Sequence, residues 1–166
     1  MRVFFRCAIY IVDLIEMLPY RFKYFCLKKI HNIHKSFKFN GPRTRIYGDG
    51  ALTIMESSYC GECCSFQLKK GTTLFIGKNC AISHNVRIYT ANKDPRYIVK
   101  GTERSTIAAD VILGDSVWVG ANVFITQGVT IGNNVVIGAN SVVTKSLPSH
   151  SVCAGNPCKV IKKYDE

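Results

Sequence analysis

Branched aliphatic residues recur at every sixth position over a long stretch of the chain. The first register of this repeat consists of Ile107, Leu113, Val119, Ile125, Ile131, Ile137 and Val143. A second register, four residues after the first, consists of Val111, Val117, Val123, Val129 and Val135, followed by Ser141 and Leu147. Neither a helix of 3.6 residues per turn nor an alternating hairpin has this period. Short strands joined by tight turns do have it, which predicts a prism with three strands in each coil of about 18 residues.

The repeat also predicts where the prism begins and where it is interrupted. Ile76, Ile82 and Ile88 keep the six-residue spacing, so the solenoid begins before residue 76, and the irregular segment 46–75 is interpreted as a terminal coil. Glycine follows four of the later aliphatic residues and is expected to ease the turns. The polar segment 92–106 breaks the period and is predicted to protrude as a loop from a corner. Long loops on rigid scaffolds often carry function.

Charge and aromatic content set the first 45 residues apart from the rest. The chain has 166 residues and a formal charge of +11, and residues 1–45 hold ten Lys or Arg but only two acids. Segment 8–18 is apolar but too short to span a bilayer, and no signal-peptide cleavage site follows it. We therefore predict a basic, aromatic-rich helical arm over 1–45 and a single solenoid domain over 46–166.

Two interpretations of the basic arm are open, and nucleic acid binding is the weakest candidate. The arm is expected to pack on the end of the solenoid with a solvated basic face. Peripheral contact with an anionic membrane surface is the alternative, because segment 20–39 interleaves aromatic residues with cations. No base-reading module or stacking motif accompanies the charge, so we expect no nucleic acid partner.

The eight cysteines do not indicate a metal site. Cys60, Cys63 and Cys64 lie close together in CGECC, but no second ligand pair follows at a suitable spacing. Of the four histidines, only His84 lies in the body of the repeat, so three imidazoles cannot gather around one ion as in a β-helical carbonic anhydrase. We expect no metal. Without a secretory signal, the thiols point to the reducing cytoplasm, at the inner face of the membrane if the arm touches it.

Two strings in the chain resemble the hexapeptide-repeat acyltransferases. The first is Gly114–Ala121 (GDSVWVGA), and the second joins Val142–Pro148 (VVTKSLP) to Ala154–Ile161 (AGNPCKVI). The second string is close to the C-terminal pattern of galactoside, maltose and polysaccharide O-acetyltransferases. The resemblance covers roughly residues 46–162. It implies an all-β fold, the left-handed parallel β-helix, whose hand differs from that of ordinary crossovers.

The resemblance also implies an activity and a donor site. Members transfer an acetyl group from acetyl-coenzyme A (acetyl-CoA) to a hydroxyl or, in some branches, to a sugar amine. The positions that match the family's coenzyme A contacts are Trp118, Gly120, Ala121, Gly138, Ala139, Thr144, Lys145, Lys159 and Lys162. The small residues would let the pantetheine arm lie against the backbone, and the last two lysines suit its phosphates.

The catalytic base departs from the family pattern. In the relatives a histidine on the protruding loop removes the acceptor's proton, but Lys93 stands at that position in the string TANKDP. A lysine normally holds its proton at neutral pH, and a neighbouring acid such as Asp94 favours the charged form. Asn92, Lys93 and Asp94 are candidate acceptor contacts, and Lys93 would suit an acidic sugar. His84 is the alternative base, since a corner of one chain can meet the next chain's cleft in a family of homotrimers.

Several functional interpretations follow from these residues. The first is an O-acetyltransferase that modifies a saccharide of a capsule, an exopolysaccharide or a lipid-linked glycan. The second is a binding or structural solenoid that kept the prism and lost the catalytic histidine. An N-acetyltransferase of an amino sugar is a further alternative. Serine acetylation fits less well, because the long helical domain of that branch is not matched in length.

Overall fold

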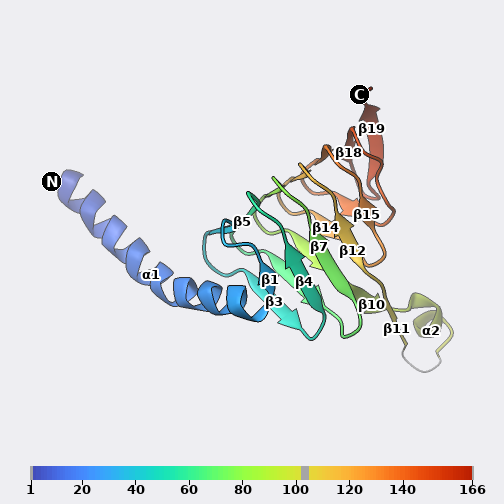
Figure 1. Ribbon diagram of the computed structural model, residues 1–166, viewed down its shortest axis with the longest axis horizontal. Helices are drawn as coiled ribbons and strands as arrows, with labels where there is room; N and C mark the ends of the chain where they lie inside the picture. Colours follow the sequence, from blue (N-terminus) through green and yellow to red (C-terminus); the bar gives the residue numbers. More distant parts are fainter. Residues whose placement is uncertain (1, 102–104, 166) are drawn as a thin grey trace.

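A β-solenoid forms the body of the molecule, and one long helix leads into it. The computed structural model describes residues 2–101 and 105–165. Helix α1 (Arg2–Ile30) extends away from the first coil, as Figure 1 shows, and the strands then wind in about five turns toward the C-terminus. The predicted fold class, an all-β solenoid with an N-terminal helix, is confirmed.

Three sheets form the faces of the prism. Sheet A consists of β1 (Asn32–Ile33), β4 (Ala51–Ile54), β7 (Thr73–Ile76), β12 (Val111–Leu113) and β15 (Thr130–Ile131). Sheet B consists of β2 (Lys38–Asn40), β5 (Tyr59–Gly61), β8 (Ala81–Ile82), β13 (Trp118–Val119), β16 (Val135–Ile137), β18 (Ser151–Ala154) and β19 (Lys159–Lys163). Sheet C consists of β3 (Arg45–Gly48), β6 (Ser65–Leu68), β9 (Arg87–Tyr89), β14 (Phe124–Ile125) and β17 (Val142–Val143). Within these sheets the pairs are parallel, except that β19 runs antiparallel to β18.

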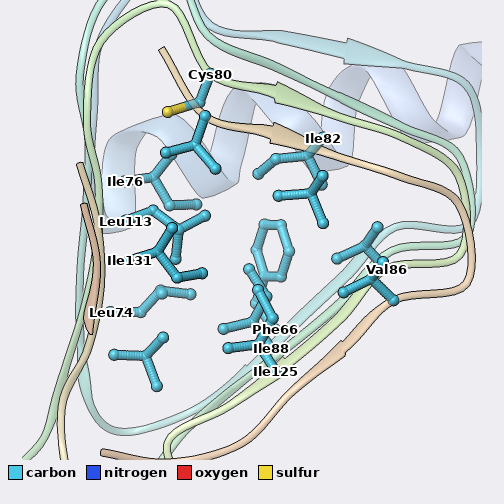
Figure 2. Close-up of a cluster of buried hydrophobic side chains, with 14 of the residues drawn as sticks. Phe66, Leu74, Ile76, Cys80, Ile82, Val86, Ile88, Leu113, Ile125 and Ile131 are labelled. Carbon is cyan, nitrogen blue, oxygen red and sulfur yellow. The ribbon is translucent and has the colours of Figure 1, made fainter. Parts of the chain in front are cut away.

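The six-residue registers fill the core as predicted. Leu113 pairs in register with Ile131, and Val119 pairs with Ile137, so equivalent side chains stack from coil to coil. Figure 2 shows this stacking in the core, and all the residues of the two registers from Val111 to Val143 are buried. Ile107 is the exception. It lies in strand β11 (Thr106–Ala108), outside the coils, and is only partly buried because the interruption continues to residue 108.

The role of glycine at the corners differs from the prediction that it eases the turns. A Cβ atom on Gly120 would lie 2.6 Å from the backbone nitrogen of Ala139, so this glycine allows close stacking between coils. At the corner that contains Gly120, asparagines adopt the left-handed turn conformation, with φ of 56° at Asn85 and 59° at Asn122 and Asn140. Asparagine tolerates this conformation because its short amide can bond locally.

Helix α1 is anchored by its C-terminal turns. Tyr24 is buried, stacks on Phe39 with ring centroids 4.2 Å apart, and donates a hydrogen bond to the carbonyl of Gly41. The first strand begins at Asn32, so residues 31–45, which the sequence groups with the arm, lie in the first coil. Many large apolar side chains between Phe5 and Ile30 are exposed. No helix in the described ranges is long and apolar enough to cross a bilayer.

The interruption of the repeat is a folded excursion. Strand β10 (Ala91–Lys93) pairs antiparallel with β11, and helix α2 (Pro95–Val99) lies between them. In Figure 1 this excursion, which we call the hairpin, projects from the prism where sheet C gives way to sheet A. Residues 102–104 of the predicted loop lie outside the described residues.

Candidate functional site

One corner of the prism brings together candidate site residues from separate coils. We call it the B–C corner, because it joins each strand of sheet B to the next strand of sheet C. Glu62, His84, Ala121 and Ala139 occupy it in successive coils. The carbonyl of His84 accepts the N–H of Asn122 at 3.0 Å, and that of Ala121 accepts the N–H of Asn140 at 2.9 Å. The candidate base and two candidate donor contacts therefore form one column.

A ladder of asparagine amides fixes this column. The Nδ2 of Asn85 donates to Oδ1 of Asn122 at 2.8 Å, and the Nδ2 of Asn122 donates to Oδ1 of Asn140 at 3.0 Å. Each amide sits one residue after a member of the column. The ladder was not predicted, although three asparagines that follow His84, Ala121 and Ala139 are visible in the sequence.

His84 is an exposed imidazole whose Nδ1 atom faces Glu62. The Glu62 carboxylate lies 3.8 Å from Nδ1, and the backbone N–H of Glu62 lies 3.3 Å from the same atom. The two contacts favour opposite tautomers, because the carboxylate calls for a proton on Nδ1 and the N–H calls for a lone pair there. For Nε2 to act as a base, Nδ1 must carry the proton and turn toward the carboxylate, an arrangement that this geometry permits.

The other candidate base lies at a different corner. Lys93 ends strand β10 and is exposed, at the corner that joins sheet C to sheet A, which we call the C–A corner. Asn92 precedes it and donates a hydrogen bond to Gln127 in the next coil, which ties the hairpin to the prism. The whole width of sheet C separates Lys93 from His84, so one chain does not bring the two candidates together.

Asp94 has a partner other than Lys93. Its carboxyl group is 2% exposed and is held by the guanidinium of Arg96, with the shortest contact at 2.7 Å, and it also caps α2 by accepting the N–H of Arg96. The hydrogen bonds from Arg96 lower the pKa of Asp94 below its ordinary value. Both oxygens are used within the hairpin, so Asp94 shapes the loop that presents Lys93.

The predicted donor contacts divide between the two corners. Gly120, Ala121, Gly138 and Ala139 lie at the B–C corner, and Ala139 is exposed. Lys159 pairs with Ala154, which lies over Gly138, directly beside the end of the column. Thr144 and Lys145 follow β17 and therefore lie at the C–A corner.

Two other predicted donor contacts lie on the faces of sheet B. Trp118 points outward from sheet B with 55% of its surface exposed. Lys162 pairs with Val152, and its Nζ lies over the ring of Tyr164 at 4.5 Å.

The cysteines of CGECC lie in the core and at the B–C corner. Cys60 and Cys64 are buried free thiols, and their mutual hydrogen bond together with burial raises the pKa of Cys60. Cys63 occupies the turn with φ of 58°. Within residues 2–101 and 105–165, no three side chains of the metal-binding types come together.

A groove on sheet C was not predicted. It has a volume of about 900 Å³ and lies between the second half of α1 and the first three strands of the sheet. Its lining includes Arg45, Arg87, Tyr47 and Tyr89, and it reaches the B–C corner at Asn85. These residues come from coils of irregular length, so no fixed spacing marks them in the sequence.

Comparisons with known proteins agree on one family. Residues 105–145 match the family model described as bacterial transferase hexapeptide (six repeats). A maltose O-acetyltransferase of Clostridium difficile 630 is 31% identical, with a TM-score of 0.55, over 80% of this chain and 72% of that one. A hexapeptide-repeat acetyltransferase of Vibrio cholerae in complex with acetyl-CoA is 26% identical, with a TM-score of 0.73, over 90% of this chain and 80% of that one.

The name of one relative specifies an acidic glycan as its acceptor. The polysialic acid O-acetyltransferase of Escherichia coli O1:K1 is 48% identical over 88 residues, which are 53% of this chain and 29% of that protein. The chain spans between 29% and 57% of the length of the first curated relatives that it matches.

The contact between Asp94 and Arg96 predicts a pH dependence of the hairpin. Because the folded pKa of Asp94 lies below its ordinary value, the contact stabilises the hairpin fully above about pH 4 and loses this effect as the pH falls through the folded pKa. Hydrogen exchange of residues 91–101, corrected for its intrinsic pH dependence, should therefore accelerate only at acidic pH. Asp94→Asn should already exchange faster at pH 7, whereas Asp49→Asn, at an exposed turn, should not. Equal protection in Asp94→Asn and the wild type at pH 7 would contradict this role.

Proposed function

The chain belongs to the hexapeptide-repeat acetyltransferase family, and we propose that it transfers an acetyl group from acetyl-CoA to a hydroxyl group of a saccharide. Two relatives whose names specify an acceptor are O-acetyltransferases of maltose and of polysialic acid. A third was solved with acetyl-CoA. The acceptor is taken to be a saccharide of a capsule, an exopolysaccharide or a lipid-linked glycan.

The column at the B–C corner is the observation that carries this proposal. Ala121 and Ala139 present only methyl groups, and the neighbouring glycines present none, so an extended pantetheine chain can lie against the backbone. Lys159 stands at the far end of the column, where a flexible cation suits phosphate groups. His84 stands at the other end, where the thioester would be placed.

The proposed reaction uses His84 as general base. Its Nε2 takes the proton from the acceptor hydroxyl while the oxygen attacks the thioester carbonyl. A C–O bond forms, the C–S bond breaks, and the coenzyme A thiolate leaves and recovers the proton from the imidazolium. Glu62 positions the ring by accepting the hydrogen of Nδ1 and stabilises the cation that forms.

Replacement of His84 tests this base. His84→Ala should lower kcat by about 10²- to 10⁴-fold, the usual contribution of general-base catalysis, with coenzyme A affinity retained. Lys93→His should change little on its own and should partly rescue His84→Ala if the hairpin reaches the same substrate. Turnover on an identified acceptor, measured by release of free coenzyme A, decides the question. Unchanged kcat in both single variants would move the base to another residue.

Replacement of Ala139 tests the donor column. Ala139→Phe should block the pantetheine path and weaken coenzyme A binding by about tenfold or more, which corresponds to about 1.4 kcal/mol. The fold should persist because the side chain is exposed. Ala51→Phe is the matched control, since Ala51 is exposed in sheet A. Calorimetric titration with coenzyme A that gives equal affinity in both variants would remove Ala139 from the site.

The division of candidate residues between two corners favours a homotrimer. His84, Ala121 and Ala139 lie at one corner, whereas the hairpin and Lys145 lie at the other. Packing of three chains would bring the C–A corner of one against the B–C corner of the next and would cover outward side chains such as Trp118. Light scattering should give the mass of a trimer at micromolar concentration, and a stable monomer would contradict this assembly.

We further propose that α1 holds the protein at an anionic membrane surface on the cytoplasmic side. Ile15, Leu18 and Phe22 are exposed, and the lysines of the last turn lie next to the solenoid. An apolar helix flanked by cations binds interfaces that carry anionic lipids. Ile15→Glu combined with Leu18→Glu should abolish sedimentation with phosphatidylglycerol vesicles, while Val160→Glu combined with Ile161→Glu should not. Equal sedimentation of both double variants would contradict the proposal.

Lys93, which stands where the family pattern has a histidine, favours a second candidate function. A binding solenoid without catalysis would keep the column and would lack the loop histidine. In that case coenzyme A binds, the wild type turns over no saccharide or amino sugar, and Lys93→His gains activity that the natural sequence does not have.

A further inference from the structure

The groove on sheet C presents two arginines in one register. Arg45 on β3 pairs with Ser65 on β6, and Ser65 pairs with Arg87 on β9. Adjacent strands are about 4.8 Å apart, so the two arginines flank the serine hydroxyl with their Cα atoms about 10 Å apart. All three residues line the groove. We call these three residues the arginine row, and an anion placed over Ser65 would lie between Arg45 and Arg87.

The positive charge of the arginine row is not neutralised within the described part of the chain. Arg43 at the groove edge pairs with Glu16 at 3.2 Å, but neither Arg45 nor Arg87 has a carboxylate of the described residues within ion-pair distance. Lys23 of α1 adds a further cation, whose Nζ donates to the carbonyl of Thr44 at 2.8 Å. Burial and the charge of Arg45 lower the pKa of Lys23. An anion in the groove would relieve this repulsion.

A second row beside the first is suited to a sugar ring. Tyr47 pairs with Gln67, and Gln67 pairs with Tyr89, two residues further along the same strands. Burial and a hydrogen bond with Tyr89 raise the pKa of Tyr47, so the two phenols lie together. Oε1 of Gln67 is buried without a hydrogen-bond partner, which leaves an unused acceptor in this row. Aromatic faces and polar groups beside a charged row match a saccharide that bears an acid better than a free inorganic anion.

The groove opens beside the candidate base. Its lining includes Cys63 and Asn85, which follow Glu62 and His84 directly at the B–C corner. The donor column occupies the later coils of this corner, and the groove occupies the first three coils. A saccharide in the groove would therefore extend to His84 from the side opposite the donor.

We propose that the arginine row Arg45–Ser65–Arg87 binds the carboxylate or phosphate group of an acidic saccharide, with Tyr47 and Tyr89 against its sugar rings. The identification of this saccharide as the acceptor rests on the proposed function. The binding itself does not, because it requires neither acetyl-CoA nor turnover. The anion accepts charge-assisted hydrogen bonds from both guanidinium groups and from the serine hydroxyl.

Calorimetric titration of the full chain without acetyl-CoA tests the binding. The probes are a galacturonic acid trimer, its methyl ester, which keeps the sugars and loses the charge, and inorganic phosphate. The acidic trimer should bind, and its methyl ester should bind at least about tenfold more weakly. Arg45→Gln and Arg87→Gln should each weaken binding of the acidic trimer by about ten- to a hundredfold, the range for hydrogen bonds to charged groups. Lys70→Gln, which makes the same charge change at an exposed turn outside the groove, should not.

A second ligand distinguishes the two acidic groups. Glucose 1-phosphate that competes with the trimer, and loses affinity in the same arginine variants, would extend the site to sugar phosphates. Equal affinity for the acidic trimer and its methyl ester, or unchanged affinity in both arginine variants, would overturn the proposal. Binding of inorganic phosphate as tight as that of the trimer would also overturn it, because the aromatic row would then contribute nothing.

The failure of this proposal can be separated from that of the proposed function. Arginine-dependent binding of the acidic trimer without any acetyl transfer would support the binding site and contradict the proposed enzymatic activity. Acetyl transfer to a saccharide, together with unchanged affinity for the acidic trimer in Arg45→Gln and Arg87→Gln, would support the enzymatic activity and overturn the binding site.

Discussion

Parallel backbone pairing between coils is the constraint on which the rest of the molecule depends. Each strand bonds to the equivalent strand of the coils before and after it, so a residue sits directly over its counterpart one turn away. Inside the prism this arrangement stacks aliphatic residues. At the corners it stacks whatever the turns contain, and close approach then requires glycine at positions such as Gly120, where any Cβ would meet backbone. The alignment of His84, Ala121 and Ala139 is therefore a direct product of the pairing.

The sequence predicted the part of the fold in which this pairing has a constant period. From Val111 to Val143 the coils keep 18 residues, so each inward residue and each corner of this stretch can be assigned from the period alone. The last coil is two residues shorter, and Leu147, predicted in the second register, pairs with Ile131 of the first. The first coils are longer, and their inward residues include Phe37, Phe66 and the thiols of Cys60 and Cys64. Since Ser65 follows Arg45 by 20 residues and precedes Arg87 by 22, only the strand pairing reveals that the three share one row.

The site was predictable to a similar extent. The Gly-Ala pairs 120–121 and 138–139 lie at the B–C corner, and strand pairing places Ala121 and Ala139 in line with His84. The sequence could not tell that Asp94 turns to Arg96, because the four hydrogen bonds from Arg96 to the Asp94 carboxylate depend on how α2 folds back. Thr144 and Ala139 follow successive strands, β17 and β16, so the six-residue period already places them at different corners.

The irregular first coils and the regular later coils suit different ligands along the B–C corner. A regular coil repeats the same small corner residues, which suits the extended coenzyme A part of the proposed donor. An irregular coil varies its outward residues without disturbing the register of the core, which suits an acceptor that differs from enzyme to enzyme. The groove lies on the irregular coils and the proposed donor column on the regular ones, with His84 where they meet. On this view the charge of Arg45 and Arg87 can change between relatives while the stacking that positions His84 stays the same, because the arginines project outward and the stacking depends only on backbone and asparagine amides.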